Sequence, residues 1–332
     1  MSAWFQSILE WIYGWVGNYG WSVVVFTLLV RLVLLPLDIK SKKSMRAMTR
    51  VQPKVNALQK KYGNDKEKLN VKLNELYRKE HVSPMASCLP MLISLPILWL
   101  MFAAMRNMAN EHTISMILQI RDTGEVPALQ SWLWIKNVFQ PDSFMSTILP
   151  KAGDALKTIS VVKSSSILTA ENIEAARAFL ATEEYAAIAA QYGANAFTSI
   201  QLSLLFFNPV ITVPTSFANL FKYANGLFIL PLMAAVSQFL MTKVTSGKQK
   251  KSADANADDE AAAAANAMNS GFMKWFFPLF SLWICAGYNA AFAIYWMAAN
   301  VIQIVQQVAV NLYFDHKDRL AEQASGEDQG IK

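Results

Sequence analysis

Long apolar runs, separated by polar stretches, dominate the pattern along the chain. A helix needs roughly 20 apolar residues to cross about 30 Å of hydrocarbon. Five runs of about this length predict transmembrane helices, at residues 19–38, 85–105, 227–244, 272–288 and 290–313. The pattern therefore predicts an all-α integral membrane protein with five spans.

A sixth apolar run, residues 200–217, is not counted as a span. Pro209 and Pro214 interrupt it, and proline breaks helix interiors by removing a backbone donor. Counting it would also reverse the side of every later loop. We expect a re-entrant or interfacial segment here, or a part of the external region.

Residues 1–18 repeat apolar side chains at helical spacing and include several tryptophans. No Lys or Arg occurs among the first 20 residues, so the basic start of a standard signal peptide is missing. Tryptophan favours the membrane–water interface. We expect an amphipathic helix lying on the membrane surface. The alternative is an N-terminal extension of the first span.

Positive charge sets the predicted orientation. Residues 40–79 hold thirteen Lys or Arg against three acids, and the loop after residue 244 is also lysine-rich. Short basic loops stay in the cytoplasm. Both loops lie on that side if two spans separate them. The N-terminus is then expected outside and the C-terminus in the cytoplasm.

The loops differ in their predicted structure. Residues 39–83 predict a cytoplasmic helical hairpin that turns at Gly63-Asn64, with narrow apolar stripes and basic faces. These faces suit anionic lipids or an RNA-containing partner, or they only fix the topology. The other segments are an external region with a helix over 169–192, a low-complexity cytoplasmic linker and an acidic cytoplasmic tail, at residues 106–225, 245–270 and 314–332.

The composition agrees with a membrane protein and gives no sign of catalysis. Hydrophobic residues make up 54% and charged residues 16% of the chain, against about 25% charged in soluble domains. Cys88 and Cys285 lie in apolar runs and form no CxxC motif. The three histidines lie outside the predicted spans. No nucleotide, HExxH or GxSxG motif occurs, so we expect no enzyme, cofactor or metal.

Arg31 lies near the middle of the first span. An arginine at mid-bilayer costs roughly 2.5–3.5 kcal/mol on insertion scales, so it should face a bundle interior or a water-filled cavity. Thr27 is one turn earlier on the same face. Carboxylates lie only at the edges of the spans, with Asp38 at the end of the first. We therefore expect water, backbone carbonyls or polar side chains to solvate the guanidinium.

Polar residues in the other spans predict the remaining walls of such a cavity. In the fifth span a polar stripe follows Trp296 at helical spacing, and the second and third spans add single polar residues. The complete predicted groove consists of Arg31, Thr27, Trp296, Asn300, Gln303, Gln307, Ser94 and Gln238. The hypothesis is a wet pocket for a guest with negative charge. The alternative is a structural arginine bonded to Asn and Gln.

Several segments, in order along the chain, resemble the YidC/Oxa/Alb insertases. The first span and the start of the hairpin read TLLVRLVLLPL and KSKKSMRAMTRVQPKVNALQKKYGND. The second span reads PMASCLPMLISLPILWLMFAAM and the external segment WLWIKNVFQPDSF. The last two spans read FFPLFSLWICAGYNAAFAIYWMAANVIQIVQQ. The resemblance as a whole covers about two thirds of the chain, and these segments occur in the same order.

The resemblance implies a five-helix bacterial insertase or chaperone in the plasma membrane, with a hydrophilic groove open to cytoplasm and lipid. The family's groove arginine and threonine fall on Arg31 and Thr27, and a substrate-contacting aromatic residue on Trp296. The implied partners are nascent membrane proteins, anionic lipids, the Sec translocon and the ribosome. The acidic tail favours ribosome contact through hairpin 40–80, and a monomer is expected.

This sequence departs from the small family core in two places. Residues 143–223 form an external insertion, and Gly287-Tyr288-Asn289 replaces a Pro-Ser-Gly-like turn. The main alternative function is a secondary transporter or channel built around an intramembrane arginine. Against it, five spans give no inverted repeat and contain no acidic ion site. A chaperone that folds proteins already inserted also fits, and an intramembrane enzyme fits less well.

Overall fold

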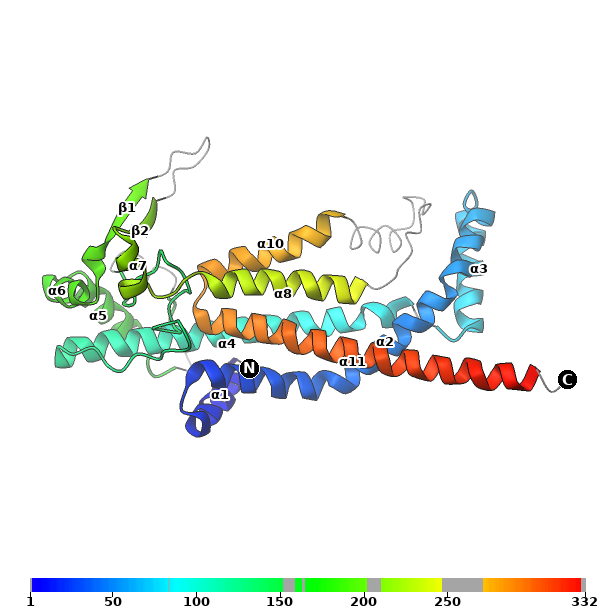
Figure 1. Cartoon of the computed structure of the whole chain (residues 1–332), viewed down its shortest axis with the longest axis horizontal. Coiled ribbons are helices and arrows are strands. Elements are labelled where there is room, and N and C mark those ends of the chain that lie inside the picture. The colour runs from blue at the N-terminus through cyan, green and yellow to red at the C-terminus, as the bar shows by residue number, and fades with distance from the viewer. Residues whose placement is uncertain are drawn as a thin grey trace. The chain divides into compact units, whose positions relative to one another are not determined.

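The computed structural model describes residues 2–82, 84–151, 159–162, 165–201, 210–246 and 271–329 (Figure 1). The chain divides into two compact units. Unit 1 comprises Met1–Thr27, Leu98–Val236 and Leu279–Ala298. Unit 2 comprises Leu28–Ile97, Ser237–Pro278 and Ala299–Lys332. Helices α2, α4, α8, α10 and α11 each contribute residues to both units.

Helices make up most of the described chain. The first four are α1 (Ser2–Val16), α2 (Tyr19–Tyr62), α3 (Lys66–Lys79) and α4 (Pro84–Thr123). The external region holds α5 (Ala170–Leu180), α6 (Glu183–Gln191), a 3-10 turn η1 (Ala194–Ala196) and α7 (Phe217–Tyr223). The last three are α8 (Ile229–Ser246), α10 (Gly271–Gly287) and α11 (Ala290–Gln329).

Two helices of the described chain are long and apolar enough to cross a membrane, within Tyr19–Tyr62 and Ala290–Leu320. Ile229–Val244 is a shorter apolar helix. The helices run past the predicted segment ends. The first span and the first hairpin helix form one helix, α2, which continues through Pro36 and Pro53. Likewise, α11 continues through most of the predicted tail.

The expectation of an all-α chain is wrong in one place. Strands β1 (Phe197–Gln201) and β2 (Val210–Pro214) pair antiparallel, with Phe197 opposite Pro214 and Gln201 opposite Val210. The β-branched sequence Val-Ile-Thr-Val favours a strand, and Pro209 and Pro214 bound it. The described part of the apolar run 200–217 thus includes the end of β1 and all of β2, and residues 202–209 fall outside the described part.

The expected helix over 169–192 consists of two helices, α5 and α6. Thr182 interrupts it, because its side chain accepts a hydrogen bond from the Tyr185 amide and caps α6. Gly193 follows α6 with φ 86°, a conformation that glycine adopts at no steric cost. The insertion is thus folded around its own helices.

Unit 1 has a hydrophobic core that joins the insertion to the end of α4. Ile114, Ile117 and Ile120 of α4 are buried in one cluster with Phe179 of α5 and Tyr185 of α6. Their spacing of three residues places the isoleucines on one face of α4. The part of α4 beyond the predicted span therefore serves as the support on which α5 and α6 pack.

Asp142 fixes the start of α8 within the same unit. Its buried carboxylate accepts hydrogen bonds from the backbone amides of Leu227, Phe228 and Leu230, at 2.8, 3.1 and 2.6 Å. The indole Nε1 of Trp134 donates a fourth, at 3.2 Å. Negative charge at a helix N-terminus satisfies free amides and complements the helix dipole. The WLWIKNVFQPDSF segment therefore holds the entry to α8.

Unit 2 contains the basic hairpin formed by α2 and α3. Val51 and Val55 of α2 are buried against Leu73 of α3. Asp65 caps α3 by accepting from the Lys68 amide at 3.0 Å. This hydrogen bond is the chief reason that the pKa of the Asp65 carboxyl is lowered. A small apolar seam thus holds the two helices together and leaves most of their basic side chains outside it.

Candidate functional site

Arg31 lies on α2 in unit 2 and is half-buried. The side-chain amide of Gln306 on α11 donates to the backbone carbonyl of Arg31 at 3.2 Å. The polar stripe of α11 therefore meets α2 at the turn that carries the arginine. Gln306 was not among the predicted groove residues. Its position next to Gln307 in the sequence is the signal that could have identified it.

Asp38 is the acidic residue nearest to Arg31 in the sequence. The charges of Arg31 and Asp38 interact electrostatically, so a carboxylate contributes to the environment of the guanidinium. Asp38 is seven residues further along α2, two turns on and on the same helix face. The prediction placed Asp38 at the edge of the span and gave it no part in the site.

Asn300 also contacts a residue that the sequence did not single out. Its side-chain amide donates to the Ser237 hydroxyl of α8 at 3.2 Å, and both side chains are buried. Serine is a small residue that lets helices approach closely in membranes and bonds across them. Ser237 precedes the predicted Gln238, which is half-buried, so the polar contact lies one position earlier than expected.

The stripe on α11 contains buried polar atoms that lack a hydrogen bond. Within the described residues, Gln306 Oε1 and Gln307 Nε2 have no partner, although both are buried. Gln303, one turn earlier, is half-buried. A buried polar group without a partner costs about 1–3 kcal/mol. These two atoms are therefore places where water or a polar group of a guest would be stabilised.

Thr27 and Trp296 belong to unit 1, apart from the residues above. The Thr27 hydroxyl is buried and donates to the Val23 carbonyl at 2.6 Å, so its proton is used within its own helix. Trp296 packs on Phe292 with ring centroids 5.6 Å apart. Its indole Nε1 is buried and has no hydrogen-bond partner in the described chain. The side chain of Ser94 lies outside the described part.

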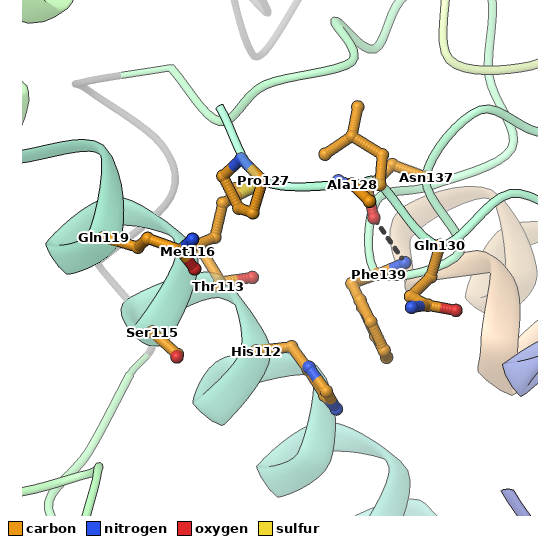
Figure 2. A pocket seen from close by; sticks show the side chains of 11 residues that line it. His112, Thr113, Ser115, Met116, Gln119, Pro127, Ala128, Gln130, Asn137 and Phe139 are labelled. Carbon is orange, nitrogen blue, oxygen red and sulfur yellow. Dashed lines mark hydrogen bonds between the residues drawn. The ribbon is translucent and has the colours of Figure 1, made fainter. Parts of the chain in front are cut away.

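A separate pocket of about 130 Å³ lies in unit 1, between α4 and the loop over residues 127–139 (Figure 2). His112 Nε2 lies 2.8 Å from the Tyr19 hydroxyl, and its ring stacks on Phe139 with centroids 4.2 Å apart. The Phe139 amide donates to Asn137 Oδ1 at 3.0 Å. Burial lowers the pKa of His112 from its usual 6.5 to about 4, so the imidazole is neutral at physiological pH.

No cluster of three or more His, Cys, Asp or Glu side chains capable of holding a metal occurs in the ranges that the structure describes. The residues described around Arg31 offer side-chain amides, hydroxyls, one guanidinium, the Asp38 carboxylate and apolar surface. These groups bind and solvate, and they offer hydrogen bonds to a passing chain.

Comparison with known proteins gives a consistent result. A family model described as 60Kd inner membrane protein matches residues 11–317. The chain is similar to the membrane protein insertase YidC of Fusobacterium nucleatum, 36% identical over 160 residues, which cover 48% of this chain and 67% of that protein. It is also similar to the insertases YidC of Endomicrobium trichonymphae and Caldanaerobacter subterraneus subsp. tengcongensis.

Those two alignments are shorter. The first is 35% identical over 139 residues, which are 42% of this chain and 24% of the relative. The second is 42% identical over 110 residues, which are 33% of this chain and 53% of the relative. The chain thus spans about a quarter to two thirds of the length of these relatives.

Proposed function

The chain belongs to the 60Kd inner membrane protein family, the YidC/Oxa/Alb insertases, and we propose that it inserts hydrophobic segments of nascent membrane proteins into the bilayer. The relatives above carry the name membrane protein insertase, which supports this function over transport or channel activity. The polar side chains described in unit 2 support it too, because they suit transient contact with many different substrate chains.

The proposed topology has five spans, with the N-terminus outside and the C-terminus in the cytoplasm of a bacterium. The spans are parts of α2, α4, α8, α10 and α11. Two of these helices are long enough and apolar enough to cross. The basic charge of the α2–α3 hairpin supports a cytoplasmic location under the positive-inside rule.

The observation that carries the proposed mechanism is the contact between Gln306 and the turn of Arg31. Buried polar atoms of Gln306 and Gln307 lie along the helix that touches this turn. Such groups lower the free energy of a polar or acidic segment that leaves water. The groove therefore partly solvates the external segment of a substrate while its apolar helix enters lipid.

Exposed apolar side chains of α2 and α11 would contact the apolar helix of the substrate. Val33 of α2 and Val305 and Leu312 of α11 have exposed side chains, which suits helices that face lipid. Burial of about 20 apolar residues in hydrocarbon drives release of the substrate. The sequence has no nucleotide motif, so the free energy comes from the substrate or from another machine.

The hairpin is the proposed contact for anionic lipids or a ribosome. Two acids of the tail bind the hairpin of the same chain instead: Asp315 pairs with Arg46 at 2.7 Å and Asp318 with Arg50 at 2.8 Å. This supports docking through hairpin 40–80 and not through the tail. We further propose that the protein acts as a monomer, alone or beside the Sec translocon.

The test is insertion of a small substrate with an acidic external segment into proteoliposomes. We expect Arg31→Ala to lower the yield about tenfold, equivalent to 1.4 kcal/mol, and Arg31→Lys to retain more because it keeps the charge. Arg121→Ala, which removes an exposed arginine at the end of α4, is the control. Undiminished insertion by Arg31→Ala, at equal protein level, would overturn the role of the groove.

A further inference from the structure

The external region carries an aromatic pair on its surface. Phe217 and Phe221 of α7 are 77% and 54% exposed, and their rings meet edge to face at 5.1 Å. They lie four residues apart and therefore on one face of the helix. Ala218 and Lys222 are exposed next to them. One face of α7 thus combines two phenylalanines with a lysine.

The charge around this face is unusually sparse. Between Glu184 and Lys243 the sequence contains a single charged residue, Lys222. Its ammonium lies 4.9 Å from the centroid of the Tyr223 ring. Aromatic side chains beside a lysine, without acids, are the chemistry of protein segments that lie in lipid headgroups. A basic partner would find no acidic side chain between Glu184 and Lys243 to bind.

The chain holds α7 close to α8. Only residues 224–228 separate the two helices, and five residues span at most about 18 Å. Lys136 Nζ donates to the carbonyls of Phe221 and Lys222, at 2.9 and 2.6 Å. The Asn225 amide donates to the Ser146 carbonyl at 2.8 Å. The loop that caps α8 through Asp142 therefore also holds the end of α7.

We infer that the exposed face of α7 is a lipid-binding foot, formed by Phe217, Phe221 and Lys222, that docks unit 1 on the outer leaflet. The inference rests on the proposed crossing of α8, since that crossing places α7 within 18 Å or so of the outer membrane surface. The phenylalanines enter the headgroup region, and the ammonium meets lipid phosphates.

The foot goes beyond the proposed insertase function because it assigns a task to the external insertion. Its anchor fixes the height of the insertion above the membrane, next to the point where α8 enters. Since Asp142 and Lys136 belong to one loop, a fixed α7 also fixes the N-terminus of α8.

The experiment uses the full chain in nanodiscs of phosphatidylethanolamine and phosphatidylglycerol. Cys88 and Cys285 are replaced by Ala, and one exposed residue at a time is replaced by Cys and labelled with a fluorophore. The sites are Ala218 on α7, Leu232 on α8 and Ala187 on α6. Lipids with a nitroxide near the headgroup quench a label that lies in the leaflet.

We expect the labels at Ala218 and Leu232 to be quenched severalfold more than the label at Ala187. In a Phe217→Ser, Phe221→Ser background, quenching at Ala218 falls to the level of Ala187, while quenching at Leu232 persists and shows that the protein is still folded. Quenching at Leu232 without quenching at Ala218 overturns the foot and leaves the insertase proposal standing.

Two further outcomes also overturn it. Equal quenching at Ala218 with and without the phenylalanines removes their role in docking. Energy transfer between labels at Ala218 of two copies, without lipid quenching, makes this face a contact between copies of the chain. An unquenched label at Leu232 shows instead that α8 does not cross, and the foot then fails together with the proposed topology.

Discussion

The side-chain amide of Asn300 donates a 3.2 Å hydrogen bond to the hydroxyl of Ser237, and both groups are buried between α11 and α8. The two residues are 63 positions apart in the sequence. The bond ties the polar stripe of α11 to α8. It fixes Asn300 against Ser237 within unit 2.

We expect Asn300→Ala and Ser237→Ala each to lower the stability of the protein by about 1–3 kcal/mol, because each leaves a buried polar partner. The double variant should lose less than the sum, with a coupling of about 0.6 kcal/mol, as is typical of hydrogen bonds between membrane helices. Thermal unfolding in nanodiscs measures all four proteins. Strictly additive losses would show that the bond does not contribute.

Gly226 lies against the carboxylate that caps α8. A Cβ at this position would overlap Asp142 Oδ1 and lie 2.9 Å from the Asp142 Cα. We expect Gly226→Ala to displace Asp142 from the amides it binds and to destabilise the protein by about 1–3 kcal/mol. The rate of amide hydrogen exchange at residues 227–230 should rise by the factor that corresponds to this loss of stability.

Gly14→Ala is the matched control for this substitution. A Cβ on Gly14 meets no heavy atom within 4 Å, and the residue lies inside α1. Alanine in a helix is favoured over glycine by about 0.5–1 kcal/mol, so the control should be neutral or stabilising. A Gly226→Ala protein as stable as Gly14→Ala would contradict the role assigned to Asp142.

The burial of His112 predicts that the protein becomes less stable in acid. Burial lowers its pKa to about 4, from 6.5 in the unfolded chain. Between these values the unfolded state binds a proton that the folded state does not, so the free energy of unfolding falls as the pH drops from about 6.5 to 4. At 1.4 kcal/mol per pKa unit the loss is on the order of 3 kcal/mol.

Thermal unfolding of the full chain between pH 7 and pH 4 tests this. His112→Gln, which cannot gain the proton, should show a shallower decline than the wild type. His316→Gln, which replaces an exposed histidine on α11, should keep the wild-type slope. Identical slopes for His112→Gln and the wild type would contradict the prediction.

The contact between hairpin and tail predicts a dependence on salt. Arg46 pairs with Asp315 at 2.7 Å, donates to the Asn311 carbonyl at 3.1 Å and lies 5.2 Å from the centroid of the Phe314 ring. Exposed pairs contribute about 0.2–1 kcal/mol each and are screened by salt. We expect hydrogen exchange over residues 311–318 to rise in 0.5 M salt, within a factor of about 5.

Charge reversal separates this network from general effects of salt. Arg46→Glu should raise exchange over the same residues at low salt, and Arg46→Glu with Asp315→Arg should restore protection. Arg121→Glu, which affects only the local pair with Asp122, should leave that region unchanged. Failure of the double variant to restore protection would mean that packing of Phe314, and not charge, holds the tail.

The apolar pattern by itself determined that this is a mostly helical membrane chain. Long runs without charge, and an arginine in one of them, follow from the cost of placing polar groups in hydrocarbon, which acts on each segment locally. The same local rule marked Asn300 and Gln307 as unusual. Turn and cap residues such as Gly63 and Asp65 also act on their neighbours, so the helices beside them could be expected.

Only the tertiary structure decided which partners these residues have. The roles of Ser237 and Gln306 depend on contacts between α8 and α11 or between α11 and α2. Asp142 caps a helix that begins 87 residues further along the chain. Strands β1 and β2 likewise depend on their pairing with each other. Periodicity reports which residues avoid water, while the fold alone determines which residue lies opposite each of them.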